Sequence, residues 1–85
     1  MKEYPKLNEA LANILRSRRE ELKLSKRKLA ELAYLERAYV IQLEQGKKRP
    51  TLNALFYLSE ALGIRADKLI CLIEDELERM AKENQ

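Results

Sequence analysis

The sequence predicts an all-α protein built from five short helices. Apolar residues recur at steps of three and four positions along most of the chain, which is the spacing of a helix with one buried face. Alternation at every second position is absent and β-branched residues are scarce, so no strand is predicted. The 85 residues allow a single domain, 1–85, with one hydrophobic core.

The first two helices are predicted over residues 7–22 and 26–33. The first follows Pro5, with Asn8 as a candidate cap, and its inward positions are apolar: Leu7, Leu11, Ile14, Leu15 and Leu22. The second begins after Ser25, whose hydroxyl oxygen can accept a hydrogen bond from a backbone N–H that has no partner within the helix. This second helix is about two turns long.

Glycines mark the ends of the third and fourth helices. The third lies between Glu36, whose carboxylate can cap the first turn or interact with the positive end of the helix dipole, and Gly46, which readily adopts the left-handed conformation found after helix ends. Thr51 is expected to cap the fourth helix, which ends before Gly63. A fifth helix is predicted over residues 66–81. The inward residues of the fourth helix are expected to be Leu52, Leu55, Leu58 and Leu62.

Positive charge is concentrated in the middle of the chain. Residues 16–49 contain eleven Lys or Arg and five acidic residues, a net charge of +6, whereas residues 50–85 carry a net charge of −3. A basic segment can neutralise phosphates and release counterions, which favours binding to nucleic acid. Solvated helix faces would produce the same charge, so the motifs must distinguish the two interpretations.

The composition argues against several other functions. The chain has no histidine and a single cysteine, so it lacks an intramolecular disulfide, the usual zinc ligands and histidine-based acid–base chemistry. Its two glycines are too few for a glycine-rich phosphate loop. No run approaches the roughly 18 apolar residues of a membrane span, and the N-terminus does not resemble a secretory signal. We therefore expect no enzymatic activity, metal, cofactor or membrane contact, and a cytoplasmic location.

The two short helices joined by Tyr34 and Leu35 have the form of a DNA-binding helix-turn-helix. Four segments carry a further pattern: Leu24-Ser25-Lys26-Arg27-Lys28-Leu29-Ala30, Tyr39-Val40-Ile41-Gln42-Leu43-Glu44-Gln45-Gly46-Lys47, Arg49-Pro50-Thr51-Leu52 and Ala61-Leu62-Gly63-Ile64. In order and spacing, these segments resemble the Cro/C1-type helix-turn-helix family, which includes the lambda repressor and Cro. The resemblance covers roughly residues 11–70, with a domain core of about 11–65. It implies a sequence-specific regulator of double-stranded DNA.

The resemblance implies that the third helix enters the major groove with its N-terminal residues against base edges. It assigns the base contacts to Arg37, Ala38 and Gln42. Arg37 can bind O6 and N7 of guanine, Gln42 can bind N6 and N7 of adenine, and Ala38 can contact a thymine methyl. The alternative for Arg37 is a solvated arginine on a helix surface.

Phosphate contacts are expected from residues around this helix. Lys26 stands where the family often has Gln, and because lysine cannot accept a hydrogen bond, a plain phosphate contact is expected there. Tyr39 either reaches a phosphate through its hydroxyl or covers the edge of the core. The remaining candidates are Arg27, Gln45, Lys47, Lys48 and Arg49.

Two further structural expectations come from the resemblance. Arg19 and Glu44 match positions at which the family commonly has a salt bridge between the first and third helices, the alternative being an exposed pair of little energetic value. Lys23 and Tyr34 stand where the family favours glycine in a left-handed conformation. A residue other than glycine there costs roughly 1–2 kcal/mol or alters the turn.

The fifth helix is expected to extend beyond the core and to form a homodimer. A two-fold dimer with residues 66–82 at its interface would hold two recognition helices about 34 Å apart, as a palindromic site requires. The alternative is a helix that folds back on its own domain. The apolar stripe of this helix consists of Ile70, Ile73, Leu77 and Met80.

A second function is compatible with the same fold. A domain of this kind can act as an adaptor or antitoxin that binds another protein, and Tyr34, Tyr39 and Ile41 would form its contact patch. The basic segment and Arg37 favour DNA, whereas the apolar residues favour a protein partner.

Overall fold

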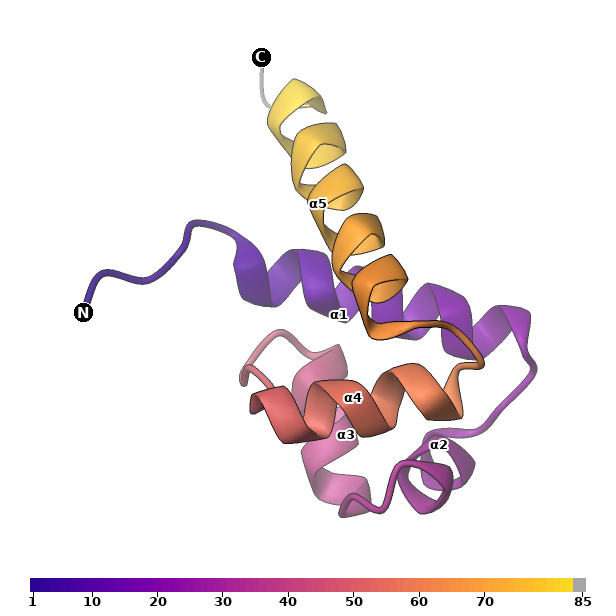
Figure 1. Cartoon of the computed structure of the whole chain (residues 1–85). Helices are drawn as coiled ribbons and strands as arrows, with labels where there is room; N and C mark the ends of the chain where they lie inside the picture. Colours follow the sequence, from indigo (N-terminus) through magenta and orange to yellow (C-terminus); the bar gives the residue numbers. More distant parts are fainter. Residues whose placement is uncertain (84–85) are drawn as a thin grey trace.

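Five helices and no strand make up residues 1–83, the part of the chain that the computed structural model describes. Asn84 and Gln85, which belong to the expected domain 1–85, lie outside the described residues. The all-α class and the order of the five helices, both expected from the sequence, are confirmed. The helices are α1 (Leu7–Glu21), α2 (Lys26–Leu32), α3 (Arg37–Glu44), α4 (Leu52–Ala61) and α5 (Ala66–Glu83) (Figure 1).

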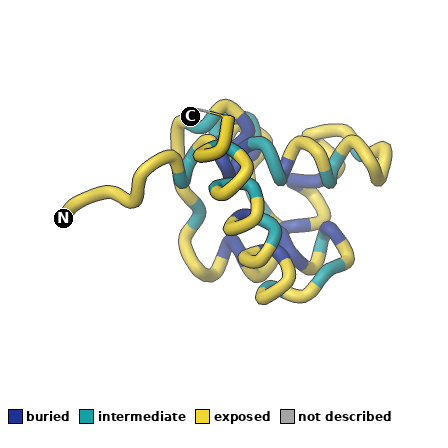
Figure 2. The backbone as a smooth tube through the Cα atoms, turned by 90° about the horizontal axis from the view of Figure 1, so that it is seen from above, coloured by how far each residue is buried: buried dark blue, intermediate teal, exposed yellow. Residues whose placement is uncertain are grey.

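Every helix contributes to one hydrophobic core. α1 contacts α3 and α5, whereas α2 contacts α3 and α4. Figure 2 shows the buried residues where the helices meet, and exposed residues on the outer faces and along the N-terminal segment. The helical spacing of the apolar residues therefore predicted the core. Its largest fully buried side chains are Leu15, Leu29, Val40, Leu43, Leu58, Leu62 and Leu69.

Two hydroxyl caps and two glycines define helix ends as expected. Ser25 Oγ and Thr51 Oγ1 each accept a hydrogen bond from the backbone N–H three residues later, at 2.9 and 3.0 Å. Gly46 and Gly63, which follow α3 and α4, have φ values of 73° and 71°. These left-handed conformations are accessible to glycine at little cost, which is why the helices stop there.

Four local expectations are wrong. Asn8 does not cap α1, because the N-cap is Lys6, which has φ 63° and makes no side-chain cap hydrogen bond. For Glu36, the N-cap of α3, the capping hydrogen bond is absent, whereas the interaction of its carboxylate with the helix dipole stays a prediction. Leu52 is 71% exposed, because the buried face of α4 is centred on later residues. Leu22 is the C-cap of α1 and is exposed, because it lies beyond the packed turns.

The apolar stripe of α5 packs largely against its own domain. Ile73 is 5% exposed and belongs to the core, and Leu77 and Met80 are partly buried against that core. The expectation that this stripe is available to a second copy is therefore wrong for Ile73, because α1 and α5 pack together and enclose it. Ile70 is 42% exposed, and the last turns of α5 extend beyond the other helices (Figure 1).

A polar cluster joins the outer part of α5 to α1. Asn13 Nδ2 donates to Glu76 Oε2 at 2.7 Å, and Arg79 donates to both oxygens of the same carboxylate at 2.8 and 2.7 Å. The hydrogen bond from Arg79 is the main cause that lowers the pKa of the Glu76 carboxyl, and the one from Asn13 adds to it, whereas partial burial opposes both.

We predict that Glu76 makes the fold sensitive to acid. Because its pKa is lower in the folded protein than in the unfolded chain, its stabilising effect is present above about pH 4.5 and is lost as the pH falls through the folded-state pKa. Glu76→Gln should lower the free energy of unfolding by about 1–2 kcal/mol at about pH 7 and leave it unchanged at about pH 2.

Urea denaturation at the two pH values measures this effect. Glu78→Gln, at an exposed position of the same helix, is the matched control and should change the free energy by less than about 0.5 kcal/mol. An equal loss for Glu76→Gln at both pH values would mean that the carboxylate charge does not contribute.

Candidate nucleic-acid interface

A buried ion pair between α1 and α3 fixes the C-terminal end of α3. Arg19 Nε donates to Glu44 Oε2 at 2.7 Å and Arg19 Nη2 donates to Glu44 Oε1 at 3.0 Å, which is bidentate geometry. The third nitrogen of this guanidinium donates to the carbonyl of Leu24 at 2.9 Å. The two side chains are 11% and 3% exposed. The predicted salt bridge is therefore present, and the alternative of an exposed pair is wrong.

The surroundings of this pair stabilise its charged form. The hydrogen bond to Glu44 raises the pKa of the Arg19 guanidinium above its ordinary value, although burial acts in the opposite direction. Arg16 adds a second cation at the same end of α3, with Nη1 3.4 Å from the backbone oxygen of Glu44. A positive charge at a helix C-terminus interacts favourably with the helix dipole. Both arginines therefore stabilise α3 where it ends against α1.

The turn between α2 and α3 keeps a left-handed backbone although it contains no glycine. Tyr34 has φ 56°, and Lys23, in the turn after α1, has φ 58°. Both residues thus retain the conformation that the family provides with glycine, at a cost of roughly 1–2 kcal/mol each. The Tyr34 ring, 79% exposed, meets the ring of Tyr57 from α4 edge to face, with the centroids 5.2 Å apart.

The residues expected to contact bases share the outer surface of α3. Arg37 and Ala38 are exposed in its first turn, and Gln42 is half-buried one turn after Ala38. The opposite face is fixed by Val40 and Leu43, which are fully buried. Arg37 has no ion-pair partner among residues 1–83, so the first turn of α3 presents an uncompensated guanidinium to solvent.

The residues expected to contact phosphates form two exposed groups. Lys26 and Arg27 lie in the first turn of α2, whereas Gln45, Lys47, Lys48 and Arg49 lie in the segment between α3 and α4. Figure 1 shows α3 between that segment and α2. Among residues 1–83, only Arg49 of these five cations has an ion-pair partner, Glu3, at 3.0 Å. The recognition helix is therefore flanked by mostly unpaired positive charge.

Tyr39 contacts the core and the backbone of its own domain. Its ring packs partly buried against the core, and its hydroxyl donates to the backbone oxygen of Arg49 at 3.2 Å. Because a phosphate oxygen can only accept a hydrogen bond, this hydroxyl has no free proton for it in this arrangement. Of the two interpretations of Tyr39, the structure favours the one in which it covers the edge of the core. It also holds the basic segment against α3.

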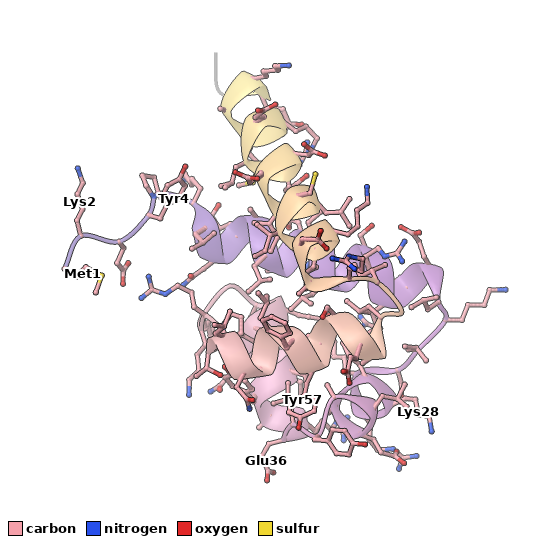
Figure 3. The ribbon with its side chains drawn as sticks, in the orientation of Figure 1. Met1, Lys2, Tyr4, Lys28, Glu36 and Tyr57 are labelled. Atoms are coloured by element: carbon pink, nitrogen blue, oxygen red, sulfur yellow. The ribbon has the colours of Figure 1, made fainter. Side chains whose placement is uncertain are left out.

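Tyr57 is a residue of this region that the sequence did not indicate. It lies on the outer face of α4, outside the helix-turn-helix, and Figure 3 shows it with Glu36 at the end of the molecule where α3 begins. The sequence feature that could have indicated Tyr57 is an aromatic residue outside the buried face of its helix. In the described part of the chain no helix is long and apolar enough to cross a membrane, and no group of acidic or cysteine side chains is arranged to hold a metal ion.

These features define a helix-turn-helix DNA-binding protein. Two short helices are in contact, a left-handed turn joins them, and cations flank the outer face of the second helix. Residues 15–69 match the helix-turn-helix family model HTH_3. Control protein C.SmaI of Serratia marcescens is 36% identical over 64 residues, which cover 75% of this chain and 76% of that protein. The chain therefore belongs to the Cro/C1-type helix-turn-helix family of DNA-binding transcription regulators.

Solved structures agree with this assignment. The clp gene regulator ClgR of Corynebacterium glutamicum has a TM-score of 0.81 and 29% identity, covering 96% of this chain and 88% of its own. The restriction-modification controller protein C.AhdI of Aeromonas hydrophila has a TM-score of 0.71 and 33% identity, covering 78% of this chain and 98% of its own. The arrangement of the helices is thus shared with proteins that regulate genes.

We predict that the Arg19–Glu44 pair is essential for the stability of the domain. Glu44→Gln leaves the Arg19 charge largely uncompensated in a buried position and should lower the free energy of unfolding by about 3–5 kcal/mol. The control is Arg18→Ala, which removes a partly exposed pair with Glu21 and should cost less than about 1 kcal/mol. Equal effects in urea denaturation would show that burial of the pair is unimportant.

Proposed function

We propose that this chain is a dimeric repressor or controller that reads a palindromic operator through the major groove. The observation that supports this most strongly is the exposed, unpaired Arg37 in the first turn of α3, with unpaired cations on α2 and in the segment after α3. In this proposal the protein has no enzymatic activity and acts in the cytoplasm, where the operator DNA is accessible. The controller role has support from the relatives described as control or controller proteins.

Each part of the surface has a distinct role in the proposal. Arg37 would bind a guanine, Ala38 would contact a thymine methyl and Gln42 would bind an adenine. The phosphate contacts would determine the position of the domain on the duplex and most of its salt dependence. Those contacts would come from Lys26, Arg27, Gln45, Lys47, Lys48 and Arg49.

The protein-adaptor alternative has less support. Three residues were expected to form the adaptor's contact patch. The ring of Tyr34 contacts the ring of Tyr57, Tyr39 packs against the core and Ile41 is half-buried. An adaptor surface normally presents a continuous exposed apolar patch, whereas of these three side chains only Tyr34 is exposed.

The dimer surface in this proposal differs from the stripe expected from the sequence. Large apolar side chains are exposed on α4 and α5 at Leu52, Phe56 and Ile70. Leu52 and Ile70 line a mostly apolar hollow of about 260 Å³, between the start of α4 and α5. A second copy packed on Leu52 and Ile70 would reduce the exposed apolar surface and leave both α3 helices free for DNA.

The proposed function is tested first by selecting bound sites from random duplex DNA and then by measuring variants on the selected site. Arg37→Ala should weaken binding to that site by about 1–3 kcal/mol, relax the base choice at one position of each half-site and leave binding to random DNA unchanged. Replacing Lys47 and Lys48 by Ala should instead weaken binding to both duplexes and reduce the salt dependence.

Mobility-shift titrations at several salt concentrations measure both effects. Arg65→Ala is the control, because this exposed arginine lies in the turn between α4 and α5, and it should bind like the wild type. If Arg37→Ala lost equal affinity on random DNA, Arg37 would be a phosphate contact. Unchanged binding on both duplexes would contradict the proposed role of α3.

The dimer is tested by replacing Leu52 and Ile70 with Gln. Both side chains are exposed, so the variant should fold, sediment as a monomer at micromolar concentration and lose about tenfold or more in affinity for the full palindrome but not for a half-site. Replacing Leu22 and Leu32, which are also exposed, by Gln is the control and should leave the dimer intact. A wild type that sediments as a monomer would refute the dimer.

A further inference from the structure

We propose that Tyr57 is a positioning residue for base recognition. Through its contact with Tyr34 it fixes the turn between α2 and α3, and therefore the direction in which Arg37 leaves the first turn of α3. This inference rests on the proposed role of Arg37 in reading a base. It adds a residue outside the helix-turn-helix to the groups that determine specificity.

The two ends of α3 are held by very different contacts. At the C-terminal end, Glu44 is held by the two short hydrogen bonds from Arg19, and both side chains are buried. At the N-terminal end, the N-cap residue Glu36 makes no side-chain hydrogen bond to the helix. Arg37 lies at this second end, and its position depends on the preceding turn, in which Leu35 packs partly buried against the core and Tyr34 is exposed.

The turn itself contains a strained residue. Tyr34 has φ 56°, a conformation that side chains with a Cβ rarely adopt. Its backbone N–H donates to the oxygen of Glu31 at 3.3 Å, and the next N–H, of Leu35, donates to Ala30 at 2.9 Å. A glycine would adopt this backbone without strain, so a side-chain contact that favours the turn offsets part of the cost of the tyrosine.

Tyr57 provides that contact from a separate element. The two rings meet at an interplanar angle of 69° with centroids 5.2 Å apart, which is the favourable edge-to-face arrangement. Tyr57 lies between Leu55 and Leu58 in the sequence, and both leucines are buried. The backbone that carries Tyr57 is therefore anchored in the core. The contact therefore links the exposed turn to a fixed helix, close to the start of α3 (Figure 3).

Tyr57→Ala should therefore weaken binding to the selected duplex by about 3- to 10-fold and leave binding to random duplex unchanged. Tyr57→Phe should bind like the wild type, because the edge-to-face contact needs the ring and not the hydroxyl. In a Tyr34→Gly background, Tyr57→Ala should have no effect, because the contact is already absent. Asn53→Ala, at an exposed position one turn earlier on α4, is the matched control.

Hydrogen exchange of the free protein tests the positioning without DNA. In Tyr57→Ala the amides of Leu35, Tyr39 and Val40 should exchange about 3- to 10-fold faster, while that of Gln45 at the other end of α3 should not change. If the wild type selects no duplex, the proposed function fails, and this measurement still decides whether Tyr57 fixes the turn.

Three results would overturn the inference. One is an unchanged ratio of specific to random binding in Tyr57→Ala. Another is a loss in Tyr57→Phe as large as in Tyr57→Ala, which would indicate a contact of the hydroxyl with DNA. The third is an effect of Tyr57→Ala that persists in the Tyr34→Gly background, because the pathway through Tyr34 would then be wrong.

Discussion

The ion pair between Arg19 and Glu44 determines where α3 lies. A helix of eight residues has little stability of its own, so α3 depends on contacts with the rest of the domain. Its buried face contributes Val40 and Leu43, and next to them Glu44 places a carboxylate out of contact with water. A buried carboxylate needs a charged partner, and Arg19 satisfies both of its oxygens. The helix proposed to face DNA is thus fixed on its buried side.

The pairing of charges differs between the two sides of the molecule. On α5, Arg79 is bound by Glu76 and Glu83, and these pairs stabilise the helix itself. Of the cations proposed to contact DNA, which lie on α2, on α3 and in the segment after α3, only Arg49 has a carboxylate partner among residues 1–83, Glu3. Unpaired cations on one face raise the local positive potential, which attracts a polyanion. The fold therefore separates the charges that hold it together from those available to a ligand.

The sequence predicted the helices, their caps at Ser25 and Thr51, and most of the core, because helical spacing and local hydrogen bonding determine them. It did not predict the exposure of Leu52 or the burial of Ile73 in its own domain. Spacing shows which residues share a helix face, but not which neighbouring helix covers that face. The contact of Tyr34 with Tyr57 joins distant parts of the chain, so only the packing of α4 beside the turn reveals it.

The proposed function depends most on α3 being held so that Arg37 reads a base directly. Methylation of guanine N7 in the selected duplex tests this claim, because the methyl group blocks the atom that the guanidinium would bind. We predict that methylation of one guanine in each half-site weakens wild-type binding at least as much as Arg37→Ala does, by about 1–3 kcal/mol or more, and makes no difference to Arg37→Ala. Equal interference for both proteins, or none for the wild type at any guanine, would contradict it.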